Sequence, residues 1–204
     1  MQVALVHDWL SGMRGGEKCL EVFCELFPDA DLYSLVYDPG NVSPTIQLMN
    51  VNASWIDRFP GGEKYFRYLL PLFPSAMESF ELANYDLILS SSHCVAKGIF
   101  PHRALHIAYI HAPMRYVWDL RDAYVSGGTS LIARAGLSLS RSYLQRWDLS
   151  SANRVDQFIA NSNNVAAKIE RLYGRSAKVI YPPVDVDRFY LTERQESYYL
   201  IVSA

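Results

Sequence analysis

The sequence predicts an α/β fold: a Rossmann-like, doubly wound and mainly parallel sheet with helices on both faces. Two observations support this prediction. Short apolar runs bounded by turn residues recur along the chain, as in strands that are covered on both sides. Segments of helical length separate several of these runs. The chain has 204 residues, of which 50% are hydrophobic and 20% charged, so it can bury one sizeable core in a globular domain.

Seven runs are expected to form strands, because each is short, apolar and bounded by turn residues. In chain order they are 3–7 (VALVH), 32–37 (LYSLVY), 45–49 (TIQLM), 86–92 (DLILSSS), 106–111 (HIAYIH), 157–162 (QFIANS) and 178–181 (KVIY). Such apolar runs suit a parallel sheet with flanking helices.

Four segments are expected to form helices. They are 17–27 after a first GGEK, 63–73 within and after a second GGEK, about 130–153, and 163–173. The last of these has the clearest ends. Ser162 is a suitable N-cap, and Gly174 suits the left-handed conformation that closes a helix.

Polar residues repeat at a 4-3-4-3 spacing along 130–153, which places them on one face of the expected helix. They are Arg134, Ser138, Arg141, Gln145 and Asp148. One interpretation is an ordinary surface helix. The other is a face that docks on anionic lipid, where Arg134, Arg141 and Arg146 supply a modest positive charge.

The bulk properties argue against several classes of protein. A net charge of −2 and a pI of about 6.2, with bases and acids interspersed, disfavour binding to nucleic acid. Three cysteines without a C-x-x-C pair fit a reducing cytoplasm, and no spacing of histidines resembles a metal site. No apolar run is long enough to span a bilayer, so we expect any membrane contact to be peripheral.

Gly15 and Gly16 lie between an apolar strand and an amphipathic helix. Glycines in this position allow backbone amides at a helix N-terminus to approach a phosphate closely. The alternative is a tight turn, in which Glu17 only favours the helix start electrostatically. The second GGEK, at 61–64, follows Phe59-Pro60 with no strand before it, so a plain turn and helix start is expected there.

His111 stands at the carboxyl end of an expected strand, the edge at which open α/β sheets bind ligands. Its imidazole can hydrogen-bond a sugar hydroxyl, take part in proton transfer, or simply cap the following turn. Arg115, Trp118 and Asp119 follow it. Their chemistry fits either pairing with one another or facing an acceptor.

The segment SSSHCVAKG, at 90–98, also follows the apolar part of a strand. It contains no G-x-S-x-G elbow, so a serine hydrolase has little support. Cys94 follows His93 directly, but neighbours in sequence point in different directions, and a buried structural cysteine is expected. A nucleotide-binding oxidoreductase is disfavoured because no G-x-G-x-x-G is present.

Five segments taken together resemble the N-terminal half of retaining GT-B glycosyltransferases of family 4. They are HDWLSGMRGGE, SSSHCVAKG, HAPMRYVWD, FIANSNNVAAKIERLYG and VIYPPVDVDRF. The likeness covers nearly all of 1–204, and it is greatest to bacterial mannosyltransferases that build O-antigen and exopolysaccharide chains. It implies retaining transfer of mannose, with the enzyme in the cytoplasm or peripheral at the inner face of the cell membrane.

The resemblance also implies roles for particular residues. Gly15 and Gly16 would approach the donor diphosphate, and His111 would be the catalytic histidine near the transferred sugar. Other residues implied at the cleft or the acceptor side are Asp8, Trp9, Arg14, His93, Arg115, Trp118, Asp119 and Ser162. The implied donor is GDP-mannose and the implied acceptor a glycan or a lipid-linked sugar. Neither a metal nor another cofactor is expected.

Two prolines in YPPVDVDRF end the sheet pattern, and a polar stretch then precedes YYLIVSA. We therefore expect a Rossmann-like acceptor-side domain over 1–181, an interdomain linker over 182–197, and the first strand of a donor-binding domain over 198–204. The donor-binding domain of the family lies outside this sequence, so the chain by itself is expected to be inactive. The alternative function is a non-catalytic module that binds an acceptor or a nucleotide.

Overall fold

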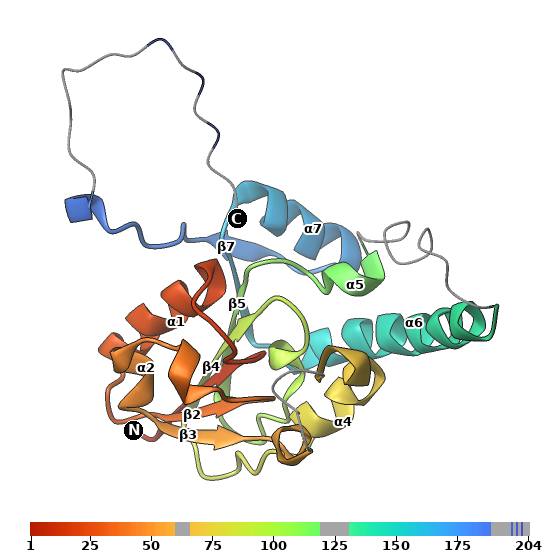
Figure 1. Cartoon of the computed structure of the whole chain (residues 1–204), viewed down its shortest axis with the longest axis horizontal. Helices are drawn as coiled ribbons and strands as arrows, with labels where there is room; N and C mark the ends of the chain where they lie inside the picture. Colours follow the sequence, from red (N-terminus) through yellow and green to blue (C-terminus); the bar gives the residue numbers. More distant parts are fainter. Residues whose placement is uncertain (60–65, 119–130, 189–196, 198, 200, 202–204) are drawn as a thin grey trace.

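The computed structural model describes residues 1–59, 66–118, 131–188, 197, 199 and 201, with side chains described for 1–59, 66–118, 140–187, 197, 199 and 201 (Figure 1). A seven-stranded sheet runs through this part of the chain, in the order β3-β2-β1-β4-β5-β6-β7, and all neighbouring strands are parallel. The strands are β1 (Val3–His7), β2 (Asp31–Ser34), β3 (Asn50–Ala53), β4 (Leu87–Ser92), β5 (Leu105–Ile110), β6 (Gln157–Ala160) and β7 (Ala177–Val179). The predicted doubly wound α/β fold is confirmed.

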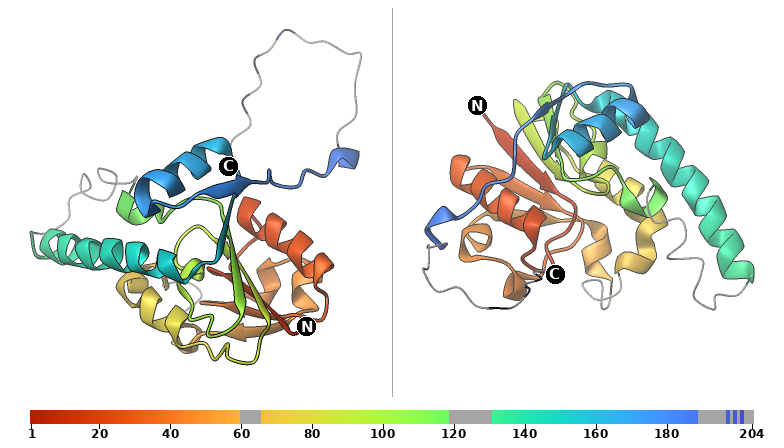
Figure 2. Two further views of the ribbon diagram at one scale, coloured as in Figure 1. Left: turned by 180° about the vertical axis from the view of Figure 1, so that it is seen from behind. Right: turned by 90° about the horizontal axis from the view of Figure 1, so that it is seen from above.

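Helices lie on both faces of this sheet (Figures 1 and 2). The α-helices are α1 (Gly15–Leu26), α2 (Pro44–Gln47), α4 (Phe73–Glu78), α5 (Arg115–Trp118), α6 (Leu131–Ser151) and α7 (Asn163–Tyr173). Short 3₁₀ helices occur at Pro39–Asn41, Trp55–Arg58, Phe66–Leu72, Ala96–Gly98, Ala152–Arg154 and Val186–Arg188.

Alternation along the strands explains why both faces are covered. Val3 and Leu5 of β1 belong to an apolar cluster with residues of α1 and α2. Ala4 and Val6 point the other way and belong to a cluster with residues of α4 and α6. Farther along the sheet, Val165 of α7 packs in a third cluster with residues of β5 and β6. Since both faces of β1 are apolar and buried, its sequence is an unbroken apolar run.

The strand order changes direction between β1 and β4. The chain builds β2 and β3 outward on one side of β1, then crosses back and places β4 on the other side, with Val3 opposite Leu87 and His7 opposite Ser91. In open α/β sheets, the carboxyl ends of the strands at such a switch point form the ligand-binding crevice. The fold therefore directs attention to the residues that end β1, β4 and β5.

The predicted strand at 45–49 is wrong: these residues form α2 and its C-terminal turn. Ser43 caps the helix by accepting a hydrogen bond from the Ile46 N–H at 3.5 Å, and Pro44 occupies the first helical position. The third strand is instead β3, whose sequence NVNA is too polar to be recognised as a strand. It lies at the sheet edge, where one side of the backbone needs no further strand.

The predicted helix at 63–73 is correct only in part. Its first residues, together with the glycines of the second GGEK, lie outside the described residues. Phe66–Leu72 is a 3₁₀ helix with Pro71 inside it, and a regular α-helix begins only at Phe73. Proline lacks the N–H that an α-helix needs, which explains the break. Strands β2, β6 and β7 also end two residues or more before their predicted limits.

The polar stripe on α6 does not form a solvated face in its described part. Arg141 Nε and Gln145 Nε2 both donate to the backbone carbonyl of Val117, at 3.0 and 3.1 Å, and Asp148 is completely buried. The expectation of a surface position is therefore wrong for Asp148, whereas Arg141 and Gln145 are half-buried and Arg146 is exposed. The lipid-docking face stays a prediction. The side chains of Arg134 and Ser138 lie outside the described part.

The C-terminal segments are described only in part. Half of the predicted linker at 182–197 and most of the predicted strand at 198–204 fall outside the described residues, so these boundaries stay predictions. In the part of the chain that is described, no helix is both long and apolar enough to cross a membrane.

Candidate functional site

Three polar side chains meet at the carboxyl edge of the sheet, where β1, β4 and β5 end. His7 Nδ1 lies 3.1 Å from Ser91 Oγ, and the same oxygen lies 2.9 Å from His111 Nε2. Residue alternation brings them together, because His7 and Ser91 are register partners in neighbouring strands and Ser91 is paired with Tyr109, two residues before His111. All three side chains therefore lie on the face of the sheet that α1 covers.

The first GGEK forms the N-terminus of α1 directly above these rings. A Cβ atom added to Gly16 would lie 3.5 Å from Cε1 of His7 and 3.8 Å from Nε2 of His111. The helical hydrogen bonds begin with the Lys18 N–H, which donates to the Arg14 carbonyl at 3.0 Å. Among the described residues, the N–H groups of Gly15 and Gly16 have no hydrogen-bond partner. The predicted strand, glycine turn and helix start are confirmed, and two amides are available to an anion.

Glu17 connects this helix start to the histidines. Its Oε2 accepts a hydrogen bond from the Arg14 N–H at 3.0 Å, and its Oε1 lies 3.9 Å from Nε2 of His7. The side chain is buried, which by itself raises the carboxyl pKa, but His7 and the backbone donors outweigh burial and lower the pKa of Glu17 below its usual value. Glu17 is therefore a buried carboxylate, not only a favourable charge at a helix start.

His111 is neutral at physiological pH. Burial lowers its pKa to about 3, and the nearby rings of His7 and His93 act in the same direction. The positive end of the α1 dipole also disfavours an imidazolium ion there. A neutral imidazole has one donor nitrogen and one acceptor nitrogen, so His111 can hydrogen-bond a hydroxyl group without bringing a charge to the site.

Asp8 organises the loop that follows β4. Its carboxylate accepts hydrogen bonds from four backbone N–H groups, those of His93 and Cys94 at 2.6 and 2.9 Å and those of Val95 and Ala96 at 2.6 and 2.7 Å. It also pairs with Nδ1 of His93 at 3.0 Å. Burial alone would raise the pKa of Asp8, but His93 and the backbone donors hold it well below its usual value.

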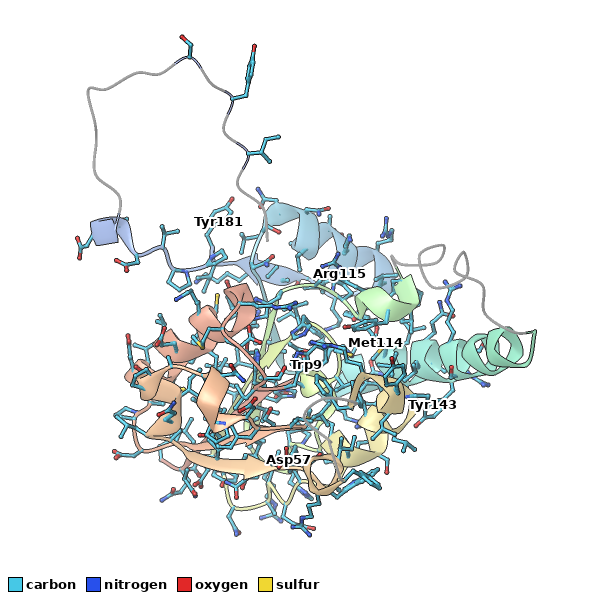
Figure 3. The ribbon with its side chains drawn as sticks, in the orientation of Figure 1. Trp9, Asp57, Met114, Arg115, Tyr143 and Tyr181 are labelled. Carbon is cyan, nitrogen blue, oxygen red and sulfur yellow. The ribbon has the colours of Figure 1, made fainter. Side chains whose placement is uncertain are left out.

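Several residues that the resemblance implied at the cleft have structural roles here. Asp8 is completely buried and both of its oxygens accept backbone hydrogen bonds, so its side chain does not reach the surface in this structure, and its place at the cleft stays a prediction. Trp9, which is labelled in Figure 3, is also buried. Its ring packs against Phe66 and His93. His93 stays partly exposed, and its pKa is raised because Asp8 outweighs the effect of burial. Cys94 is buried, as predicted, and its thiol pKa is raised by burial.

Of the remaining residues implied at the cleft, two arginines are exposed and one tryptophan is hydrogen-bonded to an aspartate. Arg14 and Arg115 are both exposed, and Figure 3 shows Arg115 at the start of α5. Trp118 does not pair with Arg115; its Nε1 donates to Oδ2 of Asp148 at 2.7 Å. Asp119 lies outside the described residues.

Ser162 is confirmed as the N-cap of α7, since its Oγ accepts a hydrogen bond from the Val165 N–H at 3.3 Å. Gly174 closes the same helix in a left-handed conformation, with φ of 63°. Ser162 lies two residues after the end of β6. Its proposed contact with a ligand stays a prediction.

Sequence reasoning missed His7, Ser91 and Glu17 as parts of one cluster. His7 ends β1 just as His111 follows β5, so its position at a strand end was a usable signal. Ser91 stands out only once the register is known, because Ser90 and Ser92 look equivalent in sequence. No group of three or more metal-binding side chains occurs within the described residues.

A second buried polar cluster was also missed. Lys97 is buried beside α6, with Nζ 2.9 Å from Oδ1 of Asp148 and 2.7 Å from Oγ of Ser151. Tyr173 of α7 donates to Oδ2 of the same aspartate at 2.9 Å. This cluster binds the elements around α6 together and lies apart from His111.

Two surface hollows lie at the opposite edge of the sheet. One is lined by 101–105 and 153–154 with Asp156, and the other by 1–3 and 26–30. Both precede strands, whereas the glycine loop and His111 follow them. We therefore place the candidate site by its chemistry and by the strand order, not by the depth of a cavity.

Comparisons with known proteins agree with this fold. A structure of Anabaena Alr3699/HepE in complex with UDP and glucose is similar over 95% of this chain and 48% of its own, with 15% identity and a TM-score of 0.50. A structure of the same protein in complex with UDP is similar over 92% of this chain and 45% of its own, with 15% identity and a TM-score of 0.49. The chain thus spans about half the length of these solved structures.

No curated protein matches the sequence. The sequence profile of Glycosyltransferase Family 4 matches residues 27–188, which is most of the chain. The match includes the segments around His93, His111 and Ser162, and it begins after the first GGEK. The chain belongs to Glycosyltransferase Family 4.

Proposed function

We propose that this chain forms the acceptor side of a retaining glycosyltransferase that moves a hexose from a nucleotide sugar to a glycan or a lipid-linked acceptor. In this proposal, 1–181 is the acceptor-side domain. Family membership supports the general activity. The observation that carries the proposal is the meeting of free amides at Gly15 and Gly16 with His111, at the switch point of the sheet.

The chemistry of glycosyl transfer suits these groups. As the bond to the anomeric carbon breaks, negative charge grows on the departing diphosphate and positive charge grows on the sugar. The amides of Gly15 and Gly16 are already oriented at a helix N-terminus, so they can stabilise the diphosphate without a metal ion. His111 can hydrogen-bond the sugar while neutral, which avoids repulsion of the positive charge on the ring.

The proposed donor is GDP-mannose, and the proposed pathway is the synthesis of a cell-surface polysaccharide. Both rest on the resemblance to mannosyltransferases. UDP-glucose is the natural competitor, because a protein of similar fold binds UDP and glucose. Full-length protein should be incubated with each donor and with lipid-linked acceptors, and the product should retain the anomeric configuration of the donor.

Gly15→Pro tests the phosphate loop in that full-length protein. Proline is tolerated at the first position of a helix, and Arg14, at φ −119° and ψ −168°, already has the extended backbone that precedes a proline. The substitution removes one amide donor, so we expect kcat to fall about 100-fold. Gly15→Ala is the matched control, since it keeps the N–H and its Cβ meets no atom within 4 Å. A folded Gly15→Pro protein with the kcat of Gly15→Ala would refute the role of this amide.

A further inference from the structure

A continuous polar chain runs beneath α1 from Glu17 to His111. Ser91 Oγ lies within hydrogen-bond distance of both rings, 3.1 Å from His7 Nδ1 and 2.9 Å from His111 Nε2. At the other end, His7 Nε2 is buried and has no hydrogen-bond partner within the described residues. It faces Glu17 Oε1 at 3.9 Å, which is an electrostatic contact but too long for a hydrogen bond.

The number of protons limits how this chain can be arranged. When His7 and His111 are both neutral, the single proton of the serine hydroxyl is donated to one ring, and the serine oxygen accepts a hydrogen bond from the other. If Ser91 donates to His7 Nδ1, then His7 carries its proton on Nε2, and His111 donates from its own Nε2. If the direction is reversed, both rings carry the proton on Nδ1. In either arrangement the two neutral histidines are therefore the same tautomer, with the proton on the same ring nitrogen.

Glu17 distinguishes the two arrangements. A proton on His7 Nε2 faces the carboxylate and is attracted to it, whereas a lone pair on the same nitrogen would be repelled. Both side chains are buried, where water screens such an interaction poorly. The carboxylate is also held in place, because its Oε2 accepts a hydrogen bond from the Arg14 N–H at 3.0 Å. The geometry thus favours a proton on Nε2 of both rings.

We propose that Glu17, His7 in its neutral form and Ser91 are positioning residues that hold His111 with its proton on Nε2, so that Nδ1 is the acceptor offered to a sugar hydroxyl. The proposal rests on the proposed function, in which His111 faces the sugar. Nδ1 of His111 has no hydrogen-bond partner among the described residues. Because Glu17 also belongs to the first turn of α1, the same carboxylate connects the glycine loop with the histidine.

The proton positions can be measured by NMR without any substrate. The 204-residue chain labelled with ¹⁵N-histidine has five histidines, which single His→Gln substitutions assign. We expect the long-range ¹⁵N–¹H pattern of an Nε2–H ring for both His7 and His111, and a slowly exchanging Nε2 proton on His111. A proton on Nδ1 of either ring would overturn the proposal.

We call the polar chain of Glu17, His7, Ser91 and His111 the relay. Two substitutions test in which direction its hydrogen bonds run. Ser91→Ala should abolish the protected Nε2 proton of His111, and Glu17→Gln should convert His7 to a mixture of the two neutral forms. Ser90→Ala is the matched control, because Ser90 Oγ makes an equivalent contact with His106 Nε2 at 2.8 Å on the opposite face of the sheet. The control should leave the His111 signals unchanged. Unchanged His111 signals in Ser91→Ala would refute the relay.

Kinetics on the full-length protein separate the relay from the proposed function. Ser91→Ala should lower kcat about 10-fold and leave the donor KM within about twofold, because the ring loses its fixed orientation but stays present. Ser90→Ala should keep kcat. If Ser91→Ala also keeps kcat in an active enzyme, the relay has no positioning role. If the proton pattern is found but no donor is used, the relay stands and the proposed function fails.

Discussion

Asp8 is the residue that determines most of the local backbone around the site. Its buried carboxylate accepts hydrogen bonds from four backbone N–H groups and pairs with the His93 ring. These interactions offset the free-energy cost of burying a charge. The loop after β4 is therefore built around the side chain of the residue that directly follows β1. This explains why a residue that looks available for a ligand in the sequence is instead fully occupied.

Gly98 is required because Trp147 occupies the space where a side chain would lie. A Cβ atom at this position would stand 2.2 Å from the Trp147 ring, far inside van der Waals contact. We expect Gly98→Ala to lower the free energy of unfolding by about 1–3 kcal/mol, because the indole must move within a packed core.

Urea denaturation of the purified chain checks this prediction. Gly12→Ala is the matched control, since an added Cβ there meets no atom within 4 Å. An equal effect of the two substitutions would mean that the loss comes from backbone freedom and not from the clash with Trp147.

At the scale of elements, the Lys97–Asp148 pair attaches α6 to the rest of the domain. Burial lowers the pKa of Lys97 although the nearby carboxylate opposes this effect. The lysine nitrogen also lies 4.9 Å from the centre of the Tyr173 ring in α7. Lys97, which precedes Gly98, therefore links the turn after β4 with two helices that follow much later in the chain.

Lys97→Met should destabilise the chain by about 3–5 kcal/mol, because it leaves the Asp148 carboxylate buried without its cation. Adding Asp148→Asn removes that charge, so the double substitution should cost less than the sum of the two single ones. Thermal and urea unfolding of all four proteins give the coupling energy. Additive losses would show that the two side chains do not stabilise each other.

At the scale of the whole molecule, buried histidines make stability depend on pH. His106 Nδ1 donates to the Arg154 carbonyl and Nε2 of the neutral ring accepts from the Ser90 hydroxyl, while burial lowers the pKa of His106 to about 4. The pKa of His111 is lowered to about 3, so both rings bind protons more readily in the unfolded chain. Their contribution is complete above the unfolded pKa of about 6.5 and is lost as the pH falls. Asp8 and Glu17, whose pKa values are lowered, act in the same direction at lower pH, whereas His93 opposes them.

His106→Gln isolates one part of this dependence. The stability difference between wild type and variant should shrink by about 3 kcal/mol from pH 7 to pH 4, because only the wild type has this histidine to protonate on unfolding. Urea denaturation at several pH values measures it, and the difference at pH 8 gives the cost of the substitution itself. A difference that stays constant with pH would contradict a neutral, buried His106.

The sequence alone was sufficient for the fold class, for the glycine turn before α1, and for His111 at a strand end. Apolar runs and helix caps depend on neighbours in the chain, so residues such as Ser162 and Gly174 could be assigned correctly. The strand prediction for 45–49 was wrong because an apolar run of five residues fits either a strand or a short helix. Here Ser43 as the N-cap and Pro44 at the first helical position favour the helix.

Only the tertiary structure determined which polar groups belong together. His7, Ser91 and His111 are separated by up to 104 positions, and the strand register brings them within hydrogen-bond distance. The same holds for Asp148, which follows the polar spacing of a surface stripe yet is buried against Lys97. Periodicity reports the local face of an element, whereas burial and partners depend on what packs against that face. The sequence by itself thus determined the fold class and the sheet edge at which the candidate site lies, and long-range packing alone decided which side chains form that candidate site.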